Sequence, residues 1–203
     1  MLKKMMFFEK IEALKDQYKD DCIVRKNGTI LLASGKIPKC KHMLFEPLPK
    51  SIIKEHLIDQ YKLPFPEDYA NFLEHMNGVG LFWVRVLLSD MEIATSLFTV
   101  YGLPLTPPFS RPLDMEEPFD VRIEGLARHK DLPAQWFKVA SYYRDFNFST
   151  IYDLFIDTDT GRIYSCEKNK SVVIEEWDNL NECFCDIYNR VADAKEEYVY
   201  KKN

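Results

Sequence analysis

The chain has 203 residues, of which 46% are hydrophobic and 29% charged, with only 7 glycines and a net charge of −5. This composition supports one large domain with a buried core and excludes a disordered, collagen-like or low-complexity protein. The charge is unevenly distributed along the chain. Residues 1–50 include eleven basic and six acidic residues (+5), and residues 51–203 include sixteen basic and twenty-six acidic residues (−10). An acidic body disfavours nucleic-acid binding and favours a basic partner, with an ordinary soluble surface as the plain alternative.

The amino-terminal part predicts two helices, one strand and a connector. Apolar residues at helical spacing predict a helix over 5–19, and residues 29–33 are a short strand candidate. Three prolines in 34–50 indicate a connector, and a second helix is expected over 51–61. The apolar run Met5–Phe8 is too short for a signal peptide, so we expect an unexported, cytoplasmic protein without a membrane span.

Residues 66–78 carry the clearest helical signal. Pro66 suits a first turn, where a missing N–H costs nothing, and the two acidic residues after it favour the positive end of the helix dipole. Apolar residues recur at i, i+3, i+4 and i+7 from Tyr69, which predicts one buried stripe. Asn77-Gly78 should end this helix, because glycine accepts the left-handed conformation.

After this helix, the spacing of the apolar residues changes from the period of a helix to the two-residue period of a strand. The strand candidates share short apolar or alternating runs and lie at 81–88, 96–101, 136–143, 150–157, 162–167 and 171–176. A proline-rich loop is expected at 104–120, then a short helix at 121–130. A capping pattern at Asn179 predicts a closing helix.

This order of elements predicts an α+β fold, with a mostly antiparallel sheet of about five to six strands and helices packed on one side. We expect residues 1–48 to form a helical extension packed on the main domain, and residues 49–203 to form that domain. No internal repeat is present.

Residues 157–161 (Asp-Thr-Asp-Thr-Gly) resemble the start of a calcium loop, but glycine falls at position five and Lys168 at position twelve. A hairpin turn is the better interpretation. The five cysteines form no C-x-x-C motif, and Cys40-x-His42 alone is a weak metal signal. With no nucleophile elbow or phosphate-binding loop either, we expect no cofactor, no metal and no catalytic residues. An enzyme whose groups converge from distant segments stays an alternative.

Several short motifs occur in one order along residues 49–192, and together this part of the chain resembles the SUKH superfamily, the SMI/KNR-type domain. The matching pieces are Leu63-Pro64-x-Pro66-x-Asp68-Tyr69-x-x-Phe72-Leu73, Asn77-Gly78, Tyr101-Gly102-Leu103, Lys138-Val139-Ala140, Tyr152-Asp153-Leu154, Gly161-Arg162-Ile163-Tyr164 and the closing helix after Trp177.

The resemblance implies an α+β fold without catalytic residues. Bacterial members look like immunity proteins that bind and neutralise a toxin, often a nuclease, whereas fungal members look like regulators of cell-wall synthesis acting through protein contacts. The amino-terminal extension and the long loop at 104–120 depart from the plain pattern.

The leading hypothesis is therefore a non-enzymatic immunity protein whose partner is a toxin domain, with no nucleic acid or membrane bound directly. A regulatory or scaffold protein of SMI/KNR type is the alternative. The candidate contact residues are aromatic or charged positions on strands, strand ends and the long loop: Trp83, Arg85, Asp114, Glu116, Glu117, Asp145, Asp153, Asp157 and Asp159. For each of them a solvated surface charge is the structural alternative.

Overall fold

A computed structural model describes residues 6–26, 28–33, 40–55, 66–88, 91–102, 132–144, 148, 150–168 and 170–201, with only the backbone for 85–88, 91–94 and 195–201. Within these ranges the elements are α1 (Phe7–Gln17), β1 (Cys22–Val24), β2 (Ile30–Leu32), β3 (His42–Leu44), α2 (Lys50–Lys54), α3 (Glu67–His75), β4 (Val79–Leu88), β5 (Met91–Val100), β6 (Trp136–Tyr143), β7 (Ile151–Asp157), β8 (Ile163–Glu167), β9 (Val173–Trp177) and α4 (Leu180–Lys201). The predicted loop at 104–120 and the helix at 121–130 lie outside the described residues.

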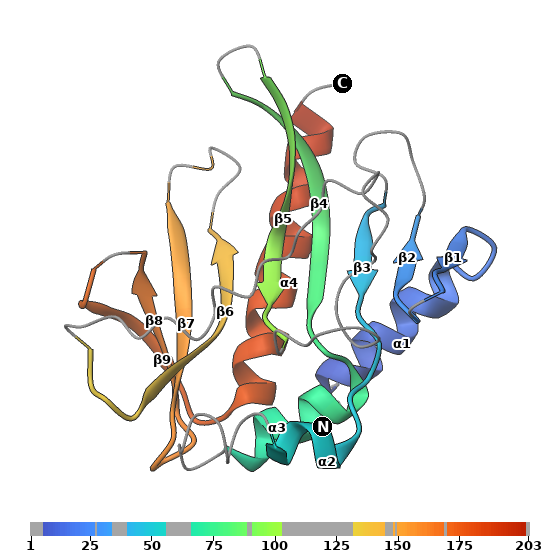
Figure 1. Ribbon diagram of the computed structural model, residues 1–203. Helices are drawn as coiled ribbons and strands as arrows, with labels where there is room; N and C mark the ends of the chain where they lie inside the picture. The colour runs from blue at the N-terminus through green and yellow to red at the C-terminus, as the bar shows by residue number, and fades with distance from the viewer. Residues whose placement is uncertain are drawn as a thin grey trace, which may run out of the picture.

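The strands form one antiparallel sheet in which each strand pairs with the next along the chain (Figure 1). The prediction of an α+β fold with an antiparallel sheet is confirmed. The predicted strand number is wrong, because the sheet has nine strands rather than five or six. Strands β1 and β3 were not predicted, whereas β2, which has the same length of three residues, was predicted from its apolar run Ile30–Leu32.

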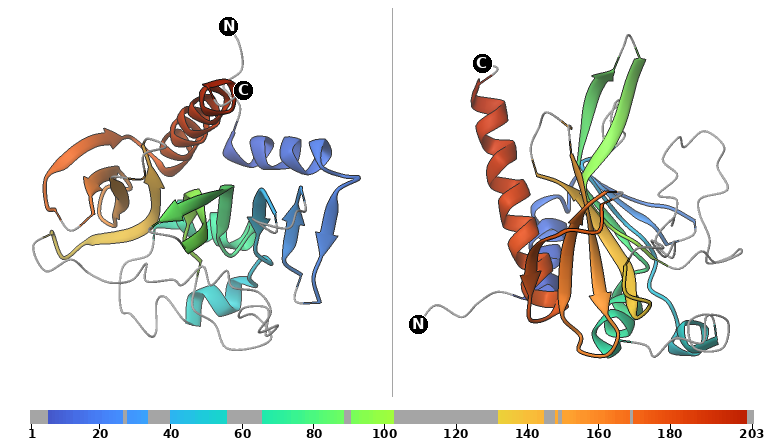
Figure 2. Two further views of the ribbon diagram at one scale, coloured as in Figure 1. Left: turned by 90° about the horizontal axis from the view of Figure 1, so that it is seen from above. Right: turned by 90° about the vertical axis from the view of Figure 1, so that its left-hand side faces the viewer.

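The main core lies between the sheet and the helices α1 and α4, which cover the same face of the sheet (Figure 2). Helix α3 lies at one end of the sheet, and α2 lies towards the opposite face (Figure 2). Phe184 of α4 is the centre of an aromatic cluster, with ring centroids 5.2 Å from Phe7 of α1 and 5.6 Å from both Phe72 of α3 and Phe98 of β5. Residues 1–48 thus contribute a helix to the main core and three strands to the sheet.

Helix α3 was predicted with Pro66 in its first turn, and in the structure it begins at Glu67 with Pro66 as the N-cap residue and has its apolar stripe buried. Gly78 follows it with φ +96°, in the left-handed region. A Cβ atom on Gly78 would lie 2.9 Å from the backbone of Gly102, and one on Gly102 would lie 2.1 Å from the carbonyl oxygen of Asn77. These two glycines let the end of α3 and the end of β5 approach each other closely.

Strand β4 changes face at Phe82, which has φ +56°. Leu81 and Phe82 both belong to the main core, whereas Trp83 belongs to a smaller cluster formed with Leu31, Cys40 and Met43. A bulky residue rarely adopts positive φ, and here the turn of the backbone buries two consecutive side chains on the helix-covered face.

None of the helices in the described ranges has the length and apolar character that crossing a membrane requires.

Candidate functional site

A cleft of about 350 Å³ opens where β6, β9 and α4 meet. Tyr142, Tyr143 and Arg144 line it from β6 and the residue after it, Glu175 lines it from β9, and Arg190 and Val191 line it from α4. The cleft is thus walled by aromatic rings and charged groups brought together from three separate parts of the chain.

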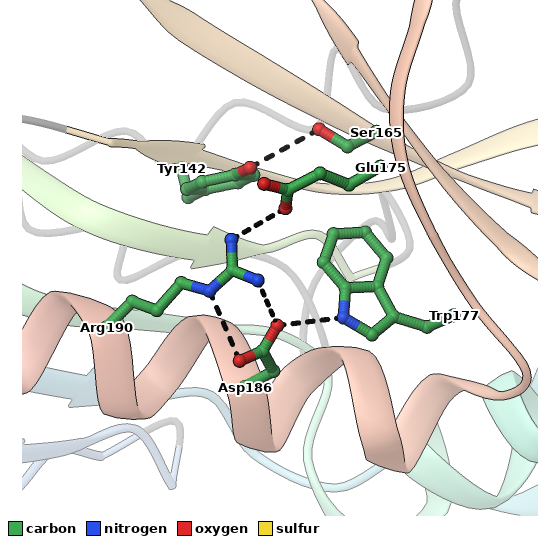
Figure 3. A network of polar contacts seen from close by, with 6 residues as sticks. All are labelled: Tyr142, Ser165, Glu175, Trp177, Asp186 and Arg190. Atoms are coloured by element: carbon green, nitrogen blue, oxygen red, sulfur yellow. Dashed lines mark hydrogen bonds and ion pairs between the residues drawn. The ribbon is translucent and has the colours of Figure 1, made fainter.

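Arg190 is the centre of a polar network in this cleft (Figure 3). Its Nη1 lies 2.6 Å from Glu175 Oε2, and its Nη2 lies 2.6 Å from Asp186 Oδ2, while its Nε donates to Asp186 Oδ1 at 3.2 Å. Partial burial opposes the charge on Arg190, but the contacts with Glu175 and Asp186 outweigh it and raise the pKa of the guanidinium. Arg190 is therefore a fixed cation joining helix and sheet.

Asp186 also accepts a hydrogen bond of 2.9 Å from the indole N–H of Trp177, the last residue of β9. The guanidinium of Arg190 lies 5.9 Å from the centre of the Trp177 ring. Helix α4 and strand β9 are therefore joined at two points, Glu175 and Trp177 (Figure 3).

Tyr142 forms the wall on the β6 side, with its hydroxyl 3.3 Å from the hydroxyl of Ser165 (Figure 3). Burial raises the pKa of Tyr142 to about 12, and the nearby carboxylate of Glu175 acts in the same direction. The phenol therefore stays neutral at physiological pH. The chemistry that this cleft offers is hydrogen bonding and aromatic contact, with its central charges already paired within the chain.

A second polar cluster is formed by strands β6 and β7 and by Tyr101, the residue after β5. Lys138 Nζ lies 2.8 Å from Asp153 Oδ1, with both side chains 10% exposed, and 5.1 Å from the centre of the Tyr101 ring. Tyr101 shares a hydrogen bond of 2.8 Å with Ser141. Burial opposes the charge of Lys138, but Tyr101 and Asp153 outweigh it, and the pKa of the ammonium is raised. Lys138 and Asp153 therefore form a buried ion pair.

The structure places the predicted contact residues in several different environments. Trp83 is only 8% exposed, and its indole N–H donates to the carbonyl of Gly80 at 3.0 Å. Asp153 is 7% exposed and paired with Lys138. The described ranges therefore leave little of either side chain for a partner to contact.

Asp157 and Asp159 lie on the hairpin between β7 and β8. Asp157 is also 7% exposed, and its Oδ1 accepts hydrogen bonds from the backbone N–H groups of Asp159 at 2.9 Å and Thr160 at 3.2 Å. This carboxylate holds the predicted hairpin turn, and Asp159 at its tip is exposed. Only the backbone of Arg85 is described, and Asp114, Glu116, Glu117 and Asp145 lie outside the described residues.

The residues of the cleft network were not among the predicted contact residues. Asp186 and Arg190 have the i, i+4 spacing of a helical ion pair, a signal that the sequence does carry. Glu175 gave no such signal, since it lies fifteen residues from Arg190 and meets it only through the fold.

Exposed apolar side chains gather at the two edges of the sheet. Apart from Met6, the large hydrophobic residues that are exposed in the described ranges lie on or beside an edge strand: Ile23 and Val24 on β1, and Val172, Val173 and Ile174 at β9. An exposed apolar edge is a ready template for another strand, and natural proteins usually protect it.

Within the described ranges, no group of three or more histidine, cysteine or acidic residues could hold a metal ion. Cys40, Cys166, Cys183 and Cys185 are buried as free thiols, and Cys22 is exposed. Comparison with protein families, curated proteins and solved structures finds no match for this chain.

Proposed function

We propose that this chain is a non-enzymatic immunity protein with a SUKH-like fold, which binds a cognate bacterial toxin and blocks it stoichiometrically. The order of motifs along residues 49–192 supports the family, and the α+β architecture with one antiparallel sheet agrees with the fold that the resemblance implies. The toxin partner follows from the family resemblance.

The observation that carries the proposal is the position of the exposed apolar side chains. They lie at the edges of the sheet, where backbone groups without a strand neighbour can pair with another chain. Such an arrangement suits recognition of a macromolecule by shape and backbone pairing.

Charge supports the same proposal. Residues 51–203 have a balance of −10, and a nuclease toxin must be basic where it contacts phosphate. An acidic inhibitor is drawn to that basic surface, which raises the association rate and helps it cover the active site.

The proposal predicts that a reading frame beside this gene encodes a toxin domain, and the absence of one would count against it. Co-expression is the test: this toxin domain should kill a sensitive host, and the full chain should restore growth when produced with it. Toxicity that persists at equal expression would refute the immunity role. A stable complex with a host protein in place of the toxin would favour the regulatory alternative of SMI/KNR type.

A further inference from the structure

Strand β9 forms one edge of the sheet, and β8 is the only strand that pairs with it in the described part of the chain. Val172 is 63% exposed, and Val173 and Ile174 are each 43% exposed. Residues 172–177 contain neither proline nor lysine, the two residues that most often protect such an edge. Its pairing with β8 has one register shift, between Ser165 and Cys166, and apart from that irregularity the backbone and the apolar side chains of this strand are open to a further strand.

The edge is also held in place before any partner arrives. Glu175 is tied to Arg190, and Trp177 to Asp186, so β9 is fixed to helix α4 on its helix-facing side (Figure 3). On the opposite face of β9, Arg162 of the β7–β8 turn contacts Glu176 at 3.4 Å. A strand held in its paired geometry loses less conformational entropy when a further strand is added.

The carboxyl end of β9 is acidic. Four carboxylates, those of Glu175, Glu176, Asp178 and Asp186, are contacted there by two guanidinium groups, those of Arg162 and Arg190, whereas Lys168 and Lys170 precede the amino end of the strand. The side chains of Glu176 and Asp178 stay 54% and 78% exposed. A partner segment with lysine or arginine would meet a complementary field here.

We propose that β9 binds an extended segment of the toxin domain as an additional strand of the sheet. This arrangement rests on the proposed function. Backbone pairing with β9 supplies affinity. Apolar side chains of the segment cover Val172 and Ile174, and a basic residue of the segment lies near Glu176 and Asp178. The chemical class of the partner segment is thus apolar and basic, with a β conformation.

The opposite edge of the sheet fits these observations less well. Strand β1 there has only three residues and belongs to the part of the chain with a balance of +5. A second copy of the chain at β9 is the competing occupant, and the test below distinguishes it from the toxin segment.

The test measures backbone hydrogen exchange in the full-length protein, free and bound to the inactivated toxin domain encoded beside its gene. Backbone amides of residues 172–176 should exchange at least about tenfold more slowly in the complex than in the free protein, because new strand pairing protects them. Amides of β1 should be unchanged.

A paired set of variants tests the side chains. Val172→Thr with Ile174→Thr should weaken binding by about tenfold, because apolar contact is lost while β propensity is kept. The matched control, Ile23→Thr with Val24→Thr, makes the same change at the opposite edge and should leave affinity unaltered.

The outcomes separate the two proposals. If the wild-type chain binds the toxin domain but β9 gains no protection, the β9 inference is wrong and the immunity role stands. If the wild-type chain does not bind that domain at all, the proposed function fails, and the inference fails with it. Protection of β9 in a dimer of the free protein would show that a second copy occupies the edge and would also overturn the inference.

Discussion

Arg190 of α4 and Glu175 of β9 are joined by an ion pair of 2.6 Å, and the same guanidinium binds Asp186 through two nitrogen atoms. This relationship fixes the long closing helix to the last strand of the sheet. It therefore links the stability of the fold to the position of the edge that we propose for binding.

Replacing Arg190 by methionine should lower the free energy of unfolding by roughly 1–2 kcal/mol, because the two carboxylates lose their shared partner in a partly shielded network. Urea denaturation measures the change. Arg162→Met is the matched control at the more exposed pair with Glu176, and its expected cost is below about 1 kcal/mol. Equal losses in the two variants would contradict a special role for Arg190.

Lys138→Met should destabilise the protein by about 3–5 kcal/mol, because it leaves the carboxylate of Asp153 buried without its cation. Lys138→Met combined with Asp153→Leu should recover most of this loss, since neither charge is then buried. Thermal and urea denaturation of the single and double variants provide the comparison. A double variant no more stable than the single one would show that the pair is not coupled.

A fragment of residues 49–203 should be insoluble or far less stable than the full chain. The truncation removes Phe7, Ile11 and Leu14, each no more than 6% exposed, from the main core. It also removes β3, which pairs with β4, and so leaves the long apolar strand β4 as a new edge of the sheet. Soluble yield and cooperative unfolding are the measurements, and a fragment as stable as the full chain would refute the expectation.

Stability should fall in alkaline solution partly through Tyr142. The folded-state pKa of about 12 lies above the ordinary tyrosine pKa of 10.0, so the stabilisation is complete below pH 10 and is lost as the pH rises towards 12. The full difference corresponds to about 2–3 kcal/mol.

Tyr142→Phe removes this titration, so the variant should lose less free energy of unfolding than the wild type between about pH 9 and about pH 11. Urea denaturation at the two pH values gives the comparison. Tyr188→Phe is the control, because burial raises the pKa of Tyr188 less strongly. Parallel losses in wild type and Tyr142→Phe would show that this phenol does not contribute.

The elements that the sequence predicted well have local signals. Helix α3 has a proline before it and Asn77-Gly78 after it, and the hairpin between β7 and β8 has an aspartate and a glycine at fixed positions. Strand β6 was predicted with its observed bounds, but its alternation breaks at a bulge between Lys138 and Ala140 that buries both Val139 and Ala140. A bulge depends on the neighbouring strand, so the pattern of one strand does not reveal it.

The sites were harder to predict than the elements. We predicted that Asp153 and Asp157 lie on the surface, but the structure buries both. Asp153 is paired with Lys138, and the carboxylate of Asp157 accepts hydrogen bonds from two backbone N–H groups. Whether a carboxylate has such a partner depends on contacts between segments, which composition and spacing do not contain. The same holds for Glu175 and Arg190 across the cleft.

The central claim is that the chain acts by binding a toxin and transforms nothing itself. The most direct measurement is a titration of the neighbouring toxin domain's activity with increasing amounts of the purified full-length chain. The account predicts a linear fall to zero at one chain per toxin domain. Complete inactivation by a small fraction of an equivalent would contradict it, because that result requires turnover.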